Sequence, residues 1–192
     1  MEYKTLSNGV EIPQLGFGVF QIPPEQTKDV VKKAIEVGYR HFDTAQAYFN
    51  EAEIGEAIKE SGIAREELFL TTKVWVSSYG YEETKKAFQE SLDKLGTDYI
   101  DLYLLHQCMG DVYSTWRAVE DLYKEGKIKA IGVCNFTQGR FTDLSLNADF
   151  PYFSPISTRI GLVNIPSFPS AKGPHASTTA PNSLWKSSVP SC

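Results

Sequence analysis

Four polar side chains stand where predicted strands end, and together they could transfer a proton. Asp43 ends the strand in "YRHFDTA", and Tyr48 follows five residues later. Lys73 lies at the end of the apolar strand "LFLTTKVW", and His106 ends "YIDLYLLH". The carboxyl ends of parallel strands meet at one face of a barrel, so we expect these four side chains to converge.

Their chemistry is complementary. A phenol is a poor acid at neutral pH because its ordinary pKa is about 10. A neighbouring ammonium stabilises the phenolate and lowers that pKa, and a carboxylate holds the ammonium in place. The chain of Tyr48, Lys73 and Asp43 is therefore predicted to be a tuned proton donor, with His106 hydrogen-bonded to a carbonyl oxygen. These groups suit protonation of a carbonyl oxygen while a hydride arrives at its carbon.

Each of the four residues also has an ordinary structural explanation. Asp43 could cap a turn, and Tyr48 could be an amphipathic surface aromatic. Lys73 could extend from the strand end to solvent, although an unpaired buried lysine is costly. His106 could be a hydrogen-bonded core histidine. The functional interpretation is favoured because all four occupy equivalent places in successive units.

The elements that position these residues alternate along the chain. Asn8-Gly9 predicts a hairpin before the first strand. Asn50, with Glu53 three residues on, predicts a capping box at a helix start. The predicted strands cover residues 15–20, 39–45, 68–75, 99–106 and 128–136, and the predicted helices 27–38, 50–62, 81–96 and 112–126. This alternation indicates parallel βα units, and because "GFGVFQ" lacks the third glycine of a dinucleotide fingerprint, a (β/α) barrel is favoured over a doubly wound sheet.

The amino-acid composition of the chain changes after about Gly139. Residues 150–192 are dense in serine and proline and carry three basic side chains and no acidic one, whereas residues 1–149 carry 16 basic and 24 acidic ones. We therefore divide the chain into a partial barrel, residues 1–139, and a divergent tail, residues 140–192, expected to be loop or disordered. Within the tail, "NADFPYFSP" and "GLVNIPSF" are candidates for short extended pieces.

Composition limits the classes of function. The net charge of -5 argues against nucleic acid as a partner, and the three positive charges of the tail are few. No apolar run reaches the length of a membrane span, and the amino terminus has no signal-peptide pattern. Cys108, Cys134 and Cys192 form neither a disulfide framework nor a metal motif. We expect a cytoplasmic protein without a metal.

The sequence resembles the aldo-keto reductases, NAD(P)H-dependent carbonyl reductases with a (β/α)8 barrel. It is most similar to small microbial members of the diketogluconate reductase and prostaglandin F synthase type. The segments that carry the resemblance span residues 3–136 and are "NGVEIPQLGFGVFQ", "GYRHFDTAQAYFNE", "LFLTTKVW", "LDKLGTDYIDLYLLH" and "GKIKAIGVCNF".

The resemblance implies roles for individual residues. The family's catalytic tetrad falls on Asp43, Tyr48, Lys73 and His106. The residues implied to contact the nicotinamide end of the cofactor are Val19, Phe20, Asp43, Cys134 and Asn135. The residues implied to surround the substrate are Phe20, Trp75, His106 and Gln107. The implied cofactor is NADPH, with NADH as the alternative, and the implied partner is a small carbonyl substrate.

The sequence also departs from the family. Cys134 replaces a usual serine, Gln107 and Cys108 replace the usual pair after the histidine, and the resemblance ends after Phe136. The later segments that bind the rest of the cofactor are not found in residues 140–192, so we expect a truncated barrel of about five βα units with an incomplete cofactor site. The alternative is a non-catalytic truncated paralogue that acts as a binding or assembly module.

An incomplete barrel has consequences for association. The family is usually monomeric, but the strands at residues 15–20 and 128–133 would both be apolar edges. We expect Ile131 and Val133 to face inward and be partly wetted, and the chain to associate with itself through these edges.

Overall fold

The computed structural model describes residues 1–149 and the backbone of residues 161–164. Its main sheet has six parallel strands in the order β7-β6-β5-β4-β3-β8. The strands are β3 (Leu15–Gly18), β4 (His41–Asp43), β5 (Phe69–Val74), β6 (Ile100–Leu105), β7 (Ile128–Val133) and β8 (Gly161–Asn164). The predicted alternation of parallel strands and helices is confirmed.

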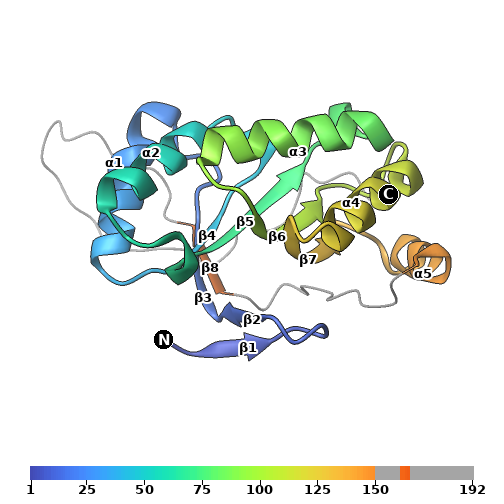
Figure 1. Ribbon diagram of the computed structural model, residues 1–192, viewed down its shortest axis with the longest axis horizontal. Coiled ribbons are helices and arrows are strands. Elements are labelled where there is room, and N and C mark those ends of the chain that lie inside the picture. Colours follow the sequence, from blue (N-terminus) through green and yellow to red (C-terminus); the bar gives the residue numbers. More distant parts are fainter. Residues whose placement is uncertain (150–160, 165–192) are drawn as a thin grey trace, which may run out of the picture.

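Helices cover one face of this sheet. In Figure 1, the helices α1 to α4 lie together along one side of the strands, and each contacts the next in chain order. They are α1 (Pro24–Glu36), α2 (Glu51–Ser61), α3 (Tyr81–Leu95) and α4 (Val112–Lys124). Gly55 allows α2 to approach α3, because a Cβ at this position would lie 2.3 Å from the carbonyl oxygen of Lys94.

The two faces of the strands form two separate apolar clusters, because side chains alternate along a strand. The larger cluster lies between sheet and helices and contains Ile131 and Val133. The smaller cluster is built around Phe69, Leu102 and Ala130. Our prediction that Ile131 and Val133 face inward was wrong by one residue of register: both are at least nine-tenths buried in the cluster shared with the helices.

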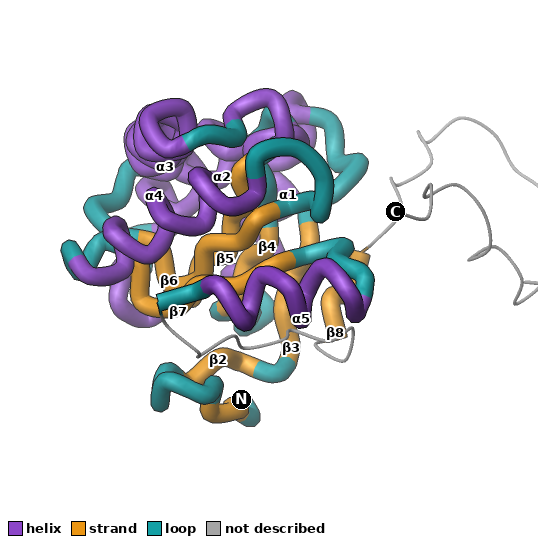
Figure 2. The backbone as a smooth tube through the Cα atoms, turned by 90° about the vertical axis from the view of Figure 1, so that its right-hand side faces the viewer, coloured by secondary structure: helices purple, strands orange, loops and turns teal. Residues whose placement is uncertain are grey.

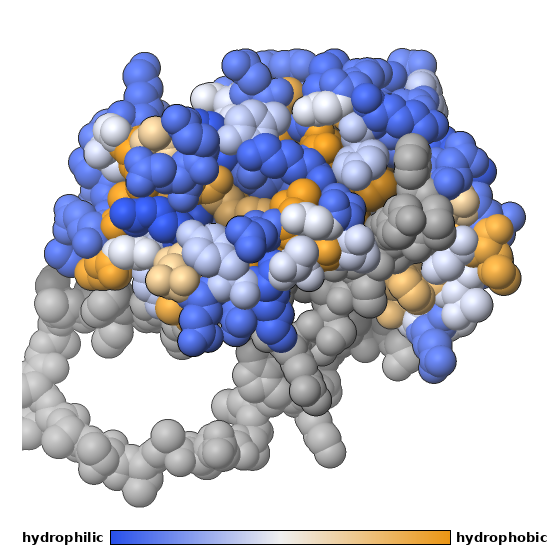
Figure 3. Space-filling model, turned by 60° about the horizontal axis from the view of Figure 1, so that its bottom comes forward, coloured by the Kyte–Doolittle hydropathy of each residue, from blue (hydrophilic) through white to orange (hydrophobic). Residues whose placement is uncertain are grey.

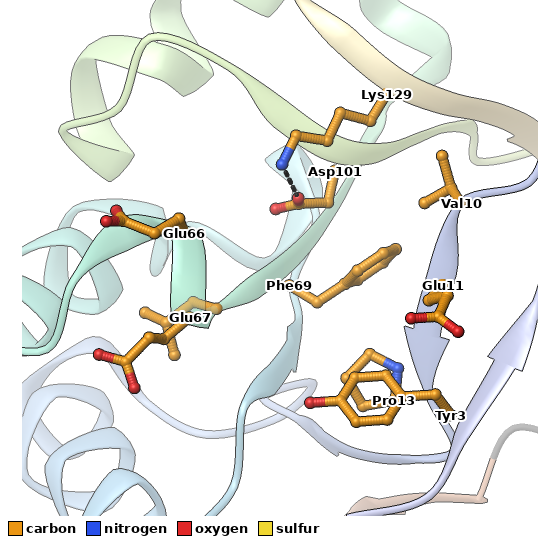
Figure 4. A pocket seen from close by; sticks show the side chains of 10 residues that line it. Tyr3, Val10, Glu11, Pro13, Glu66, Glu67, Phe69, Asp101 and Lys129 are labelled. Carbon is orange, nitrogen blue, oxygen red and sulfur yellow. Dashed lines mark ion pairs between the residues drawn. The ribbon is translucent and has the colours of Figure 1, made fainter.

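A hairpin closes the amino-terminal end of the strands, as predicted from Asn8-Gly9. It pairs β1 (Tyr3–Thr5) with β2 (Glu11–Pro13), and Gly9 has a φ of 86° that a side chain would disfavour. Beside it lies a pocket of about 290 Å³, which Figure 4 shows between the hairpin and the starts of β5, β6 and β7. In this pocket Lys129 forms an ion pair with Asp101, with 3.1 Å between Nζ and Oδ1.

The edge strands differ from our prediction. We expected the strand at residues 15–20 to be an edge, but β8 pairs with β3 in parallel from Leu15 to Gly18. Gly161–Asn164 lies within "GLVNIPSF", one of the candidate extended pieces, and its pairing satisfies backbone groups that an edge strand would leave open. Among the described strands, β7 pairs only with β6. Self-association through an edge stays a prediction.

Residues 138–147 form the helix α5 (Gln138–Asn147), although we expected loop or disorder from residue 140. The Thr137 side chain accepts a hydrogen bond from the Arg140 amide, which satisfies one of the free N–H groups at the helix start. Leu144 then packs into the larger core cluster. In Figure 2, α5 lies beside the strands, and hydrogen bonds from Tyr113 to Asp143 and from Arg117 to the Asn147 carbonyl oxygen join it to α4. The division of the chain at residue 139 stays a prediction, and residues 150–160 and 165–192 lie outside the described residues.

Figure 3 shows mostly hydrophilic side chains on the face that it draws, with small hydrophobic patches between them. None of the helices in residues 1–149 is long and apolar enough to cross a membrane.

His41 at the start of β4 is a buried titratable group. Burial lowers its pKa from 6.5 to about 4, an effect that the Asp43 charge opposes. Its ring packs so closely against Gly16 that a Cβ there would lie 2.5 Å from Nδ1. Between pH 6.5 and 4, the unfolded chain binds a proton at this residue that the folded chain does not, so the free energy of unfolding falls as the pH falls through this range.

We predict that His41 contributes a loss of about 1 kcal/mol in unfolding free energy between pH 7 and 5.5, in addition to the loss from His106, whose pKa is also lowered to about 4. Urea denaturation at both pH values measures the total loss, and comparison with a His41 variant isolates the part that is due to His41. His41→Asn should be less stable at pH 7 but should lose about 1 kcal/mol less than the parent on acidification. Equal losses in parent and variant would contradict the prediction.

Candidate active site

A buried ion pair stands at the carboxyl ends of β4 and β5. Lys73 Nζ lies 2.6 Å from Asp43 Oδ1 and donates a second hydrogen bond to the Thr44 carbonyl oxygen at 2.8 Å. The side chains of Lys73 and Asp43 are only 5% and 10% exposed. The parallel pairing of His41 with Phe69 and of Asp43 with Thr71 places the two strand ends side by side. The predicted contact is present.

The lysine stays charged despite its burial. Burial by itself lowers the pKa of Lys73, but attraction to Asp43 and to Tyr48 outweighs it, so the pKa is raised above the ordinary value. The positive charge of Lys73 is thus held at the carboxyl ends of β4, β5 and β6. We call this end of the sheet the mouth.

Tyr48 reaches this charge from the loop after β4. The short 3-10 helix η1 (Gln46–Tyr48) ends in a left-handed Phe49 with φ 57°, and this turn directs the phenol back toward the strands. Lys73 Nζ lies 3.5 Å from Tyr48 Oη and 5.0 Å from the centre of its ring. The ammonium can therefore stabilise negative charge on the phenol oxygen.

The direction of the tyrosine pKa corrects our prediction. Burial raises the pKa of Tyr48, and this effect exceeds the lowering that Lys73 causes. We expected the ammonium to produce a net fall. The phenol is hence protonated at neutral pH, and Lys73 reduces the cost of its ionisation rather than making it a strong acid.

His106 follows β6 and completes the cluster. Its ring lies 5.7 Å from that of Tyr48 and 5.0 Å from that of Trp75, both nearly edge-on. Burial, reinforced by the Lys73 charge, lowers the pKa of His106 to about 4. Its buried Nδ1 has no hydrogen-bond partner among the described residues. A neutral imidazole can donate a hydrogen bond from one ring nitrogen and accept one at the other.

The residues predicted to contact substrate fall around this cluster, but not equally. Phe20 is 48% exposed, and its ring lies 5.0 Å from that of Tyr48. Trp75 and Gln107 are half-buried beside His106. Val19 is fully buried in the core between sheet and helices, where its carbonyl oxygen accepts a hydrogen bond from Asn50. The structure thus brings Phe20, Trp75 and Gln107 to the mouth, whereas the side chain of Val19 lies beneath it.

The residues predicted to hold a nicotinamide carboxamide follow β7. Cys134 is close enough to Lys73 and Asp43 for their charges to act on its thiol, whose pKa is raised by burial. Asn135 has a left-handed φ of 56°, and its amide nitrogen donates to the His106 carbonyl oxygen at 2.9 Å. The chemistry of this set fits a carboxamide: a neutral thiol, an amide carbonyl oxygen, and an apolar ring at Phe20.

Two polar side chains that sequence reasoning missed or misassigned support the site. Gln46 accepts a hydrogen bond from the Trp75 amide at 2.9 Å and donates to Ser78 at 3.0 Å. Asn50 occupies the N-cap position of α2, but its side chain makes no capping bond. It is fully buried and joins the carbonyl groups of Val19 and Ile22 to Thr44 instead. The only sequence signal for these structural roles was that Gln46 and Asn50 flank Tyr48, each two residues away.

No group of three histidine, cysteine, aspartate or glutamate side chains within the described residues is placed to hold a metal ion.

Comparison with known proteins identifies relatives with this architecture. The sequence profile of the Aldo/keto reductase family matches residues 14–154. Glyoxal reductase of Bacillus subtilis is 52% identical over 146 residues, which are 75% of this chain and 53% of that protein. The 9,11-endoperoxide prostaglandin H2 reductase of Trypanosoma cruzi is 50% identical over 142 residues, which are 73% of this chain and 50% of that protein.

Solved structures of aldo-keto reductases are similar to this chain in fold as well as in sequence. A putative 2,5-diketo-D-gluconic acid reductase B has a TM-score of 0.75 at 41% identity and shares 80% of this chain and 55% of its own. An aldo-keto reductase of Bombyx mori, in complex with NADP, has a TM-score of 0.73 at 36% identity and shares 78% and 55%. The chain spans about half the length of the curated relatives it matches. With this match over most of its residues, the chain belongs to the aldo/keto reductase family.

Proposed function

We propose that this site reduces the carbonyl group of an aldehyde or ketone to an alcohol, with NADPH as cofactor, NADH as the alternative, and Tyr48 as the proton donor. The observation that carries the proposal is the chain in which Asp43 holds Lys73 at 2.6 Å and Lys73 reaches the Tyr48 phenol at 3.5 Å. The family relationship and the oxidoreductase names of the relatives support the same class of reaction.

In this proposal, Tyr48 gives its phenolic proton to the substrate oxygen as negative charge develops there. The phenol is protonated beforehand because burial raises its pKa. The ammonium of Lys73 then stabilises the phenolate that remains, and the buried environment makes that attraction stronger than it would be in water. Asp43 and the Thr44 carbonyl oxygen keep the ammonium aimed at the phenol.

His106 has a different task. With a pKa lowered to about 4, its imidazole is neutral at physiological pH and does not compete with Tyr48 as an acid. It orients the carbonyl oxygen by a hydrogen bond. The rings of Tyr48 and Trp75 contact the His106 ring, and the Phe20 ring contacts that of Tyr48. These aromatic rings favour an apolar group on the substrate.

The residues that would hold the reactive end of the cofactor are Asp43, Phe20, Cys134 and Asn135, with the backbone around Val19. When bound, the cofactor supplies the hydride for the carbonyl carbon. The amide of Asn135 and the thiol of Cys134 offer polar contacts to a carboxamide.

The first test removes the proposed acid. Tyr48→Phe should lower kcat for NADPH-dependent reduction of para-nitrobenzaldehyde by at least about 100-fold, because general acid catalysis supplies about that much. Cofactor binding should be nearly unchanged. Tyr113→Phe, which removes an exposed phenol bonded to Asp143, is the control and should keep full activity. A Tyr48→Phe variant as active as the parent would falsify the assignment, and a parent that binds NADPH without turnover would favour a non-catalytic binding module.

The second test concerns the buried ion pair. Lys73→Met leaves Asp43 charged without its partner, so we expect a loss of about 3–5 kcal/mol in unfolding free energy, together with loss of activity. Lys33→Met removes the exposed pair between Lys33 and Glu36 and should cost less than about 0.5 kcal/mol. Thermal denaturation compares the two. Asp43→Asn combined with Lys73→Met should recover part of the stability but not the activity, and equal costs for the two lysines would contradict the structure of the site.

The third test concerns cofactor affinity. The residues that we assign to the cofactor all lie at its nicotinamide end, and remote contacts normally supply much of the binding energy. We expect NADPH to bind with a Kd above roughly 1 μM. Titration followed by quenching of tryptophan fluorescence measures this, since Trp75 lines the mouth. Tight stoichiometric binding would mean that further residues hold the adenosine end.

A further inference from the structure

The turn that follows β6 is held by three side chains from three other parts of the chain. Asn135 donates to the carbonyl oxygen of His106 at 2.9 Å. Tyr79 donates to that of Gln107 at 2.7 Å. Arg140 donates to that of Cys108 from two guanidinium nitrogens, at 3.1 and 2.9 Å. Three successive carbonyl groups that leave the strand ladder are thus satisfied by side chains.

Tyr79 makes the most complete of these contacts. Its phenol also accepts a hydrogen bond from the Gln107 amide at 3.0 Å, so one oxygen binds both backbone groups of one residue. A phenol can donate and accept at the same time only while it is protonated. Burial raises the pKa of Tyr79, which keeps the proton in place.

Tyr79 is itself fixed from both sides. The next residue, Gly80, donates its buried amide to the Thr115 hydroxyl of α4 at 2.9 Å. On the other side, Gly110 packs against the ring, where a Cβ would lie 3.3 Å from Cδ2 of Tyr79. The buried Thr115 of α4 is thereby connected, through Gly80 and Tyr79, to the backbone beside His106.

The segment that carries Tyr79 also carries Trp75, whose ring contacts that of His106. Between them lies the 3-10 helix η3 (Val76–Ser78), and Gln46 holds both Trp75 and Ser78 from the loop that presents Tyr48. Residues 75–79 therefore contact the imidazole through a ring at one end and its backbone turn through a phenol at the other. Neither Gln107 nor Cys108 is a proline, so the φ angles of this turn are not restrained by a ring and need outside contacts.

We infer that Tyr79 is a positioning residue of the reaction: through both backbone groups of Gln107 it fixes the turn after β6 and so holds His106 and the Gln107 side of the mouth in the orientation that receives the substrate carbonyl. This inference rests on the proposed function for its kinetic consequence. The contact itself can be measured without turnover.

The test is Tyr79→Phe, which keeps the ring and removes the oxygen. Hydrogen exchange at the Gln107 amide, followed by NMR or mass spectrometry, should accelerate about tenfold, since a hydrogen bond of about 1.4 kcal/mol corresponds to this factor. For reduction of para-nitrobenzaldehyde with NADPH, KM should rise about tenfold with kcat within about threefold of the parent, because His106 orients substrate while Tyr48 remains the acid. The pH profile of kcat should not move.

Tyr81→Phe is the matched control. Its phenol donates to Asp121 at 2.8 Å, which joins α3 to α4 and involves no backbone group of the turn after β6. This variant should leave both Gln107 exchange and KM at parent values. Unchanged exchange and KM in Tyr79→Phe would overturn the inference, and so would a fall in melting temperature equal to that of the control with no change at Gln107. If the parent chain reduces no carbonyl compound but Tyr79→Phe still accelerates Gln107 exchange, the proposed function fails while the hold on the turn is supported.

Discussion

The structure of the mouth depends on the buried ion pair between Lys73 and Asp43. An unpaired ammonium in this position would be expensive, and a carboxylate 10% exposed would be no cheaper. Each charge offsets the desolvation cost of burying the other, and the Thr44 carbonyl oxygen accepts a further hydrogen bond from Lys73. Because the two residues end adjacent parallel strands, correct pairing of β4 with β5 is a condition for the pair to form.

Burial and charge act on the neighbouring groups in opposite directions. For Tyr48, burial outweighs the lowering of the pKa by Lys73, and the phenol holds its proton. For His106, burial and the same ammonium act together, and the pKa falls to about 4. One positive charge can therefore stabilise negative charge on the Tyr48 oxygen, as the proposed reaction requires, and it adds to the effect of burial in lowering the pKa of His106. This separation of roles lets two titratable groups lie side by side without exchanging functions.

Around this charge, the loops at the carboxyl ends of the strands are held by single polar side chains. Gln46 joins the loop after β4 to the segment after β5. Asn50 joins the loops after β3 and β4, and Tyr79 joins the segment after β5 to the turn after β6. Each contact spans neighbouring βα units, so the mouth is connected around the sheet as well as through it. Loops at a functional site need such contacts because they lack the ladder bonds of the strands.

The sequence alone determined the βα repeat and the hairpin at Asn8-Gly9, because strand and helix periods and turn residues are local features. It also placed Asp43, Tyr48, Lys73 and His106 at or just after strand ends, and their meeting then followed from the rule that parallel strands point their carboxyl ends at one face. It did not determine the net direction of the Tyr48 pKa, since burial depends on all the side chains that pack around the phenol. The same applies to Asn50, whose capping pattern was sound locally but whose amide found buried carbonyl groups more than 20 residues away. The register of Ile131 and Val133, the partner of β3 and the hold of Tyr79 on Gln107 were likewise decided by tertiary structure, because each is a contact between segments whose relative placement no local pattern encodes.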